Sequence, residues 1–168
     1  MSYSFASTKM KRNLHFREVQ HFTTGTQGPK GQRVFFLQFG SSGNLMTLKL
    51  EKMQVQALAD FLDQLLEDVE PINYNDVPIA LELIEPISPE WSVSSIGVAF
   101  EERNSEFVIV VEEQSDESDP GVVQIHLTPG QVKAFVTRAV DVVKAGRPPC
   151  IYCGEPLNHS DGWCPCSN

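Results

Sequence analysis

The sequence predicts an α+β fold built from two similar halves, each with the order strand, strand, strand, helix. Apolar residues alternate along several short stretches, which is typical of strands with one buried face, and then recur at helical spacing. The two junctions between strand and helix also resemble each other, because residues 50–58 (LEKMQVQAL) are echoed by residues 127–135 (LTPGQVKAF). We therefore expect two pseudo-repeated units, about residues 14–70 and 93–146, joined by a proline-rich segment at 71–92.

Three strands with one apolar face need a cover, and the helix that follows them supplies an apolar stripe. We expect a two-layer domain over residues 1–146. Its antiparallel strands form one sheet or two apposed sheets, related by a pseudo-twofold axis, with the helices on one side. Residues 147–168 are expected to form a separate tail.

Turn residues separate the predicted strands of the first half. A glycine-rich loop at residues 23–33 follows the first strand, and the sequence Gly-Ser-Ser-Gly-Asn joins the other two into a hairpin. The helix begins after Glu51, has Gln54 at its third position, and ends before Pro71 because proline interrupts a helix. The expected strands are residues 14–22, 34–39 and 45–50, and the helical stripe is Val55, Leu58, Leu62, Leu65 and Val69.

The proline-rich segment is expected to hold one short edge strand at residues 79–84. In the second half, Thr128 is a good N-cap, Pro129 suits the first helical position, and Gln131 completes a capping box. The helix should stop near Gly146, ahead of two prolines. The expected strands of this half are residues 93–101, 106–112 and 122–127.

All four cysteines lie in the last 19 residues. Cys150 and Cys153 stand three residues apart and are followed by glycine, which is the pattern of a zinc knuckle in which two thiolates hold one ion. Cys164 supplies a third ligand, and the fourth is Cys166 or His159. A redox pair or free thiols are the alternatives. Four protein ligands close a metal site, so we expect a structural Zn²⁺ ion rather than a catalytic one.

Composition and charge exclude several classes of protein. The chain of 168 residues is 41% hydrophobic and 21% charged, as in ordinary soluble domains. No apolar run is long enough to span a bilayer and the N-terminus does not resemble a secretory signal, so we expect a cytoplasmic protein that does not bind membranes. The net charge is −9, although residues 1–33 hold six Lys or Arg and one acidic residue. The acidic body argues against nucleic acid as a partner.

The glycine-rich loop offers backbone amides and Arg33, which suit a phosphate group. It joins two strands and has no helix N-terminus, so it matches neither a P-loop nor a dinucleotide fingerprint, and a plain hairpin loop is the simpler interpretation. His15 and His21 are expected on one face of the first strand, and His126 on another strand. No nucleophile stands in a recognisable setting near them.

Several short motifs resemble one known family. They are Phe22-Thr-Thr-Gly25, Gly31-Gln-Arg-Val-Phe-Phe-Leu-Gln38, Leu50-Glu-Lys with Gln54-Val55, Glu90-Trp91, Gly146-Arg-Pro-Pro-Cys150 and Cys153-Gly-x-Pro-Leu157. With these motifs, spread over almost the whole chain, the sequence resembles a bacterial family known as domain of unknown function 3090. The resemblance implies a cytoplasmic bacterial protein of this length that ends in a zinc-type knuckle, and it implies no activity. The chain departs from the family pattern at Gly162, where members carry histidine, and at Cys166, where they carry arginine.

These features favour a non-catalytic module that binds a protein or a small ligand and carries a structural zinc site. A knuckle at the end of the chain projects from the domain, so we expect a protein partner at the tail, with Tyr152, Leu157 and Trp163 as candidate apolar contacts. The alternative is an enzyme that acts on a phosphorylated small molecule through the glycine-rich loop, Arg33 and nearby histidines.

Overall fold

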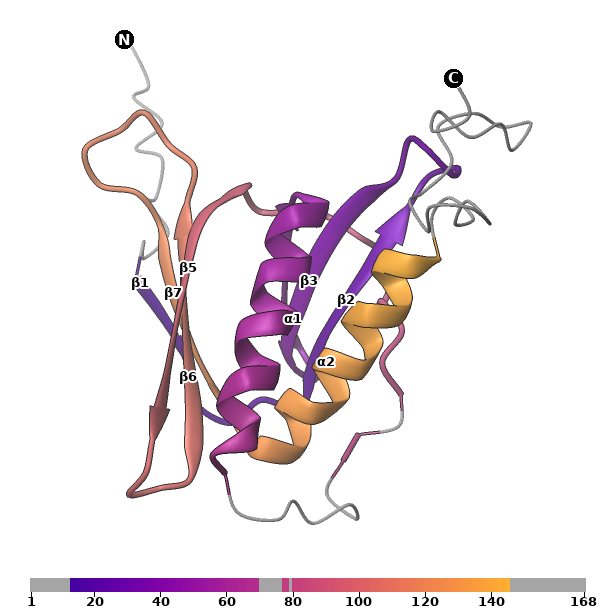
Figure 1. The fold of residues 1–168 in the computed structure, drawn as a ribbon. Helices are drawn as coiled ribbons and strands as arrows, with labels where there is room; N and C mark the ends of the chain where they lie inside the picture. Colours follow the sequence, from indigo (N-terminus) through magenta and orange to yellow (C-terminus); the bar gives the residue numbers. More distant parts are fainter. Residues whose placement is uncertain (1–12, 70–76, 79, 146–168) are drawn as a thin grey trace, which may run out of the picture.

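The structure is a computed structural model, and it describes residues 13–69, 77–78 and 80–145. Within these residues the protein is an α+β fold with two sheets and two helices. Along the chain the elements are β1 (Asn13–Phe16), β2 (His21–Gln27), β3 (Val34–Ser41), β4 (Asn44–Leu50), α1 (Lys52–Glu67), β5 (Val93–Glu101), β6 (Glu106–Glu113), β7 (Val122–Leu127) and α2 (Pro129–Lys144). Figure 1 shows α1 and α2 side by side across the two sheets.

The strands form a three-stranded sheet in the order β2-β3-β4 and a four-stranded sheet in the order β1-β7-β6-β5. All neighbours are antiparallel except β1 and β7, which are parallel and therefore depart from the all-antiparallel arrangement that the sequence predicts. The order strand, strand, strand, helix occurs once from β2 to α1 and once from β5 to α2. In each run the three consecutive strands are neighbours in one sheet.

The chain passes between the two sheets at two places. The first is residues 17–20, which link β1 to β2, and the predicted single strand at 14–22 is therefore wrong. Both Phe16 and Val19 are buried there, so the apolar pattern continues across a break in the strand. The second is residues 90–92, which run beside β4 before entering β5, with Trp91 O accepting from Lys49 N at 3.0 Å.

Both helices begin with the capping residues that the sequence predicts. Glu51 N donates to Gln54 Oε1 at 2.7 Å, and Thr128 N donates to Gln131 Oε1 at 3.0 Å. Each of these glutamines also uses its amide nitrogen to hold one of the crossings between sheets. Gln54 Nε2 donates to Val93 O at 3.0 Å, and Gln131 Nε2 donates to Val19 O. The repeated glutamine thus satisfies helix-terminal N–H groups and ties each helix to the point where the chain changes sheet.

One hydrophobic core lies between the sheets and the helices. Its fully buried side chains come from β3, β4, β6, β7 and both helices, and they include Leu37, Phe39, Leu48, Val55, Leu62, Phe107, Ile109, Ile125 and Phe135. Burial of each such side chain stabilises the fold by roughly 1.5–3 kcal/mol. Neither of the two described helices is long and apolar enough to cross a membrane.

Residues 81–84 of the proline-rich segment lie against the outer face of the three-stranded sheet. Gln38 is fully buried on this face and binds both backbone groups of Ile84, accepting from Ile84 N at 2.7 Å and donating to Ile84 O at 2.9 Å. Residues 80–84 are not a strand, so the short edge strand predicted there is wrong; Ile79 lies outside the described residues. The backbone of Ile84 bonds to the Gln38 side-chain amide instead of to a neighbouring strand.

The predicted glycine-rich loop is shorter than expected, because residues 23–27 belong to β2 and only residues 28–33 connect β2 to β3. Gly25 is a strand residue whose role is close packing, since a Cβ atom there would lie 2.6 Å from Leu83 Cγ. Gly28 does have the positive φ of a turn residue, 101°. The two glycines therefore have different roles: Gly25 allows close contact with the proline-rich segment, and Gly28 allows the turn.

Candidate functional site

A polar cleft of about 380 Å³ lies where the end of β2 and the last turns of α2 meet the proline-rich segment. We call it the arginine cleft, after Arg33 and Arg138. The remaining lining residues are Thr26, Gln27, Leu83, Glu85, Ile87, Asp141, Val142 and Ala145. The cleft thus combines residues from both halves of the chain with residues of the segment that joins them.

Arg33 enters the cleft from the loop just before β3. Its Nη1 atom donates to Val142 O at 2.8 Å, in the last turn of α2, where backbone carbonyls have no partner within the helix. Its guanidinium also stacks over the ring of Phe35, 4.9 Å from the centroid. Burial lowers the pKa of Arg33. Arginine nevertheless stays charged in proteins, so the cleft holds a partly desolvated cation.

Arg138 reaches the cleft from the side of α2 that faces β2. Its Nε atom donates to Thr24 O at 3.2 Å, which is a carbonyl on the edge of the three-stranded sheet. A guanidinium has five N–H donors, and among the described residues each arginine makes one hydrogen bond. Each side chain is therefore held in place by a backbone carbonyl at the cleft.

Two carboxylates, Glu85 and Asp141, share this cleft with the two arginines, and both acidic residues are exposed. Across the described part of the chain, no ion pair joins either arginine to either acid. The formal charges balance, so the cleft does not concentrate free anions as a purely basic pocket does. Its chemistry suits a ligand that presents a carboxylate or phosphate to the arginines and a cationic or hydrogen-donating group to the acids.

The three histidines of the described residues lie elsewhere, since none of them lines the cleft. His15 and His21 are on different strands in different sheets, so the prediction that they share one face is wrong. His15 is in register with Gln124 on the exposed face of the four-stranded sheet. His21 Nε2 lies 2.9 Å from Gln38 Oε1 on the covered face of the other sheet.

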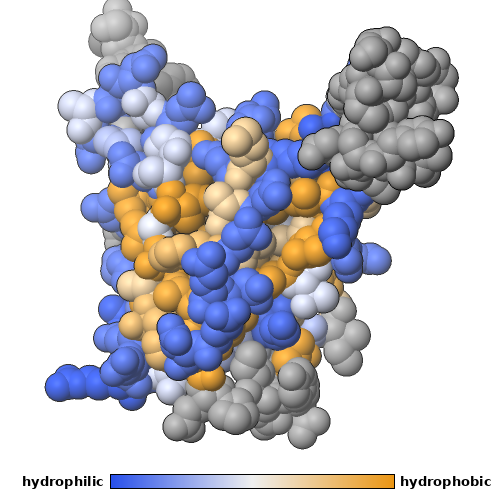
Figure 2. All heavy atoms as spheres, in the orientation of Figure 1, coloured by the Kyte–Doolittle hydropathy of each residue, from blue (hydrophilic) through white to orange (hydrophobic). Residues whose placement is uncertain are grey.

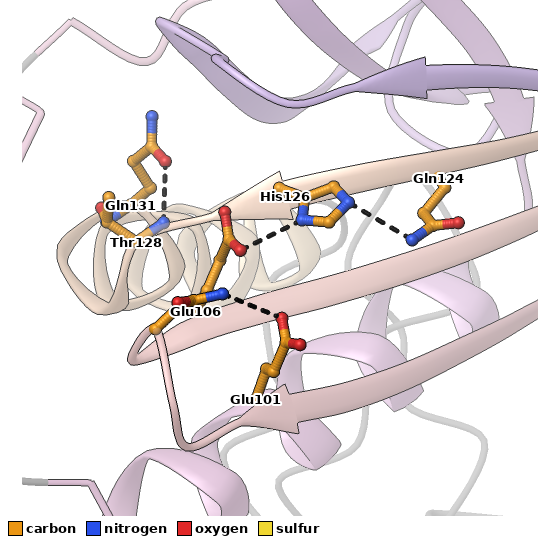
Figure 3. Close-up of polar contacts among 7 residues, drawn as sticks. Glu101, Glu106, Gln124, His126, Thr128 and Gln131 are labelled. Atoms are coloured by element: carbon orange, nitrogen blue, oxygen red, sulfur yellow. Dashed lines mark hydrogen bonds and ion pairs between the residues drawn. The ribbon is translucent and has the colours of Figure 1, made fainter.

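His126 lies between two polar side chains on the exposed face of the four-stranded sheet (Figure 3). Its Nδ1 atom is 3.1 Å from Glu106 Oε2, and its Nε2 atom is 3.2 Å from Gln124 Nε2. These contacts fit a neutral ring that donates from Nδ1 to the carboxylate and accepts at Nε2 from the amide. Both ring nitrogens of His126 therefore have a polar partner on the surface of the sheet.

The predicted metal ligands, Cys150, Cys153, Cys164 and Cys166 with His159 as the alternative fourth, all lie outside the described residues. Among the residues that are described, no group of three or more His, Cys, Asp or Glu is placed to hold a metal ion. The zinc site therefore stays a prediction from the sequence.

Comparison with known families gives one result. A family described as protein of unknown function (DUF3090) matches residues 14–164. This chain belongs to that family. The match covers 164 − 14 + 1 = 151 of the 168 residues, and it includes the cleft, both sheets and three of the four cysteines. A search of curated proteins finds no match.

The sequence pointed to Arg33 but not to Arg138, its companion in this DUF3090 chain. One signal for Arg138 was present in the aligned halves. Gln54 and Gln131 are 131 − 54 = 77 residues apart, and the same offset aligns Arg138 with Phe61. Arg138 thus stands where the first half has a large apolar residue, and it lies between Phe135 and Val142 on the apolar side of its helix. An arginine in such a position indicates a side chain with a polar partner. That partner is the carbonyl of Thr24, in the other half of the chain.

Proposed function

We propose that this protein is a cytoplasmic, non-catalytic binding module that holds a protein segment or small ligand in the arginine cleft and carries one structural Zn²⁺ ion in its tail. The observation that supports it most is the pair Arg33 and Arg138. Each is anchored to a backbone carbonyl and each lines a cleft of about 380 Å³. Arginines held this way need little reorganisation to bind a carboxylate or phosphate.

The composition of the cleft favours binding over catalysis. Among the described residues that line it there is no histidine, cysteine, serine, lysine or tyrosine, and the potential nucleophiles are limited to Thr26 and the carboxylates of Glu85 and Asp141. Its two acids, Glu85 and Asp141, are exposed. A partner segment with both acidic and basic side chains complements the balanced charge.

The zinc part of the proposal rests on the sequence. Cys150, Cys153 and Cys164 supply three thiolates, and Cys166 or His159 supplies the fourth ligand, which closes a tetrahedral site. A cluster of thiols in a reducing compartment favours a metal over disulfides, in keeping with a cytoplasmic location. Ala145 lines the cleft and is followed directly by the segment that leads to the cysteines. We propose that the knuckle docks a protein partner whose adjacent residues enter the cleft.

A pull-down from cell lysate tests this proposal. The intact protein is compared with a chain truncated after Gly146, with Arg33→Ala and with Arg138→Ala. Arg103→Ala is the matched control, because Arg103 is an exposed arginine on the loop between β5 and β6 and does not line the cleft. We expect the truncated chain and both cleft variants to lose the same partner, while Arg103→Ala retains it.

Different patterns would narrow or refute the proposal. A partner lost only on truncation places recognition in the tail alone. If all variants and the truncated chain retain the partner equally, neither the tail nor the cleft takes part in the interaction, and the proposal is refuted. Each variant is first checked by circular dichroism and urea denaturation, because Arg33 and Arg138 also hold backbone carbonyls.

The second candidate is an enzyme that acts on a phosphorylated small molecule, which Arg33 and the loop at residues 28–33 favour. The structure supplies a second arginine for a phosphate, but the histidines that this function invoked do not line the cleft. A screen of phosphorylated metabolites for turnover, with loss of activity in Arg33→Ala at unchanged stability, would establish this alternative.

We also infer that the two halves are copies of one unit. The equal order of elements, the 77-residue offset between Gln54 and Gln131, and the double role of these glutamines support the inference. Superposition of residues 32–69 on residues 106–145 tests it. A strand before one helix without a counterpart before the other would refute it.

A further inference from the structure

A second hollow lies between α1 and β5. Its lining is mainly apolar and contains no arginine, unlike that of the arginine cleft. It has a volume of about 570 Å³ and is lined by Gln54, Ala57, Leu58, Phe61, Ser94, Ile96, Gly97 and Val98. Figure 2 shows apolar residues gathered between α1 and the strands of the four-stranded sheet. Phe61 is 47% exposed at this hollow, and Met53 on the same helix is 81% exposed. We call this hollow the β5 groove.

The floor of the β5 groove is an edge of the four-stranded sheet, because β5 is the last of the described strands in the order β1-β7-β6-β5. Gln54 occupies only the start of that edge, donating to Val93 O and Ser94 O. In the described part of the chain, residues 95–101 have no backbone hydrogen bond on the side away from β6. An unpaired row of N–H and C=O groups is a template for another strand.

Strand β5 also lacks the features that normally protect an edge. Residues 95–100 (SIGVAF) contain no charge and no proline, and the irregularity in its pairing lies at Val93–Ser95, at the start of the strand. Natural edge strands usually carry lysine, proline or a central bulge to prevent association. The composition of residues 95–100 therefore leaves this part of β5 open to pairing with another strand.

The other half of the chain shows what closes such an edge. Arg138 aligns with Phe61 at the 77-residue offset, and it donates to Thr24 O on the edge of β2. The helix α2 therefore occupies the edge of the three-stranded sheet through its own side chain. Phe61 has no donor, so in the described part of the chain α1 bonds the edge of β5 only through Gln54, at Val93 and Ser94.

We propose that a second copy of this chain fills the β5 groove, with the two β5 strands paired antiparallel about a twofold axis at Gly97. In this register Ser95 faces the partner's Ala99 and Ile96 faces the partner's Val98, so no like charges meet. Gly97 faces its own copy, and it has open space around it, since a Cβ atom there would have no neighbour within 4 Å. The two four-stranded sheets become one continuous sheet.

A twofold axis perpendicular to the sheet keeps both α1 helices on the same face. The two grooves then merge across the axis, and each Phe61 gains apolar surroundings in place of water. Such self-complementarity is what a symmetric interface requires. The net charge of −9 on each chain opposes the approach of two copies, so association should strengthen with salt, which screens this repulsion.

Sedimentation velocity of the intact protein over a range of concentrations and at low and high salt tests the proposal. We expect a dimer that is favoured by salt. Gly97→Lys and Gly97→Glu each place like charges on the axis and should weaken association about tenfold or more, which corresponds to about 1.4 kcal/mol. An equimolar mixture of the two variants should restore the dimer through one Lys–Glu contact. The open space at Gly97 allows both side chains in the monomer.

Phe61→Ser and Val140→Ser form a matched pair, because both are exposed apolar residues on helices and only Phe61 lines the groove. We expect Phe61→Ser to weaken the dimer and Val140→Ser to leave it unchanged. A protein that stays monomeric at every concentration and salt overturns the proposal. So does a dimer that Gly97→Lys leaves intact, or a charge-swapped mixture that associates no better than either variant alone.

Discussion

Replacement of Gln38 by methionine tests how the proline-rich segment is held to the three-stranded sheet. Gln38 is fully buried and makes four hydrogen bonds: with Ile84 N at 2.7 Å, Ile84 O at 2.9 Å, Thr47 Oγ1 at 3.1 Å and His21 Nε2 at 2.9 Å. Methionine has nearly the same length and shape but provides none of these bonds. The substitution therefore separates hydrogen bonding from packing.

The expected loss in the free energy of unfolding depends on which former partners of Gln38 can form a new hydrogen bond. A typical hydrogen bond contributes about 1 kcal/mol net, so four lost bonds set a loss of about 4 kcal/mol. Thr47 Oγ1 loses the donor from which it accepts, and Ile84 is 49% exposed, so that its backbone can reach water if the segment lifts away. We expect the free energy of unfolding to fall by about 2–4 kcal/mol, a large share of the usual stability of a domain.

Urea denaturation followed by circular dichroism measures this loss, and hydrogen exchange at the Ile84 amide reports whether the segment has detached. Gln56→Met is the control, since Gln56 is exposed on α1, and it should change stability by less than about 0.5 kcal/mol. A loss below about 0.5 kcal/mol for Gln38→Met, with the Ile84 amide still protected, would show that the four bonds do not hold the segment.

Three further substitutions test other contacts. Gly25→Ala should lower the free energy of unfolding by about 1–3 kcal/mol in urea denaturation, because its Cβ atom would lie 2.6 Å from Leu83 Cγ, whereas Gly97→Ala, in open space, should have no such cost. Gln131→Met should cost about 1–2 kcal/mol in the same assay, since it removes the capping bond and the tie to the first crossing; an unchanged midpoint would refute that role. Cys150→Ser should abolish zinc binding in elemental analysis and leave the circular dichroism of the β-rich core largely intact, and acidification of the intact protein should release the metal because thiolates become protonated. Complete unfolding on chelation would contradict a separate tail.

The elements that the sequence predicted well are those specified by neighbouring residues. Thr128, Pro129 and Gln131 form a start signal within four residues, and α2 begins where they place it. The strands β5, β6 and β7 each alternate between buried and more exposed positions, which the period of two reveals without knowledge of their partners. Local rules suffice here because each residue's environment is determined by the element itself.

The errors occurred where distant segments decide the conformation. Residues 14–22 carry one apolar pattern, yet the chain changes sheet at residues 17–20 because β1 pairs with β7, more than 100 positions away. Gly25 looked like a loop residue, and only Leu83 explains why a strand needs glycine there. The sequence predicts a strand that includes residues 80–84, but the side-chain amide of Gln38 binds both backbone groups of Ile84, and these residues form no strand.

The sequence by itself determined the α+β class, the capping glutamines at the two helix starts, the family and the candidate zinc ligands of the tail, because each is read from short patterns of neighbouring residues. The tertiary structure decided that Arg33 and Arg138 share a cleft, and that β5 is left at an edge beside Phe61. Both features join segments far apart in the chain. Their geometry depends on how the sheets and helices pack, and local sequence carries no record of that packing.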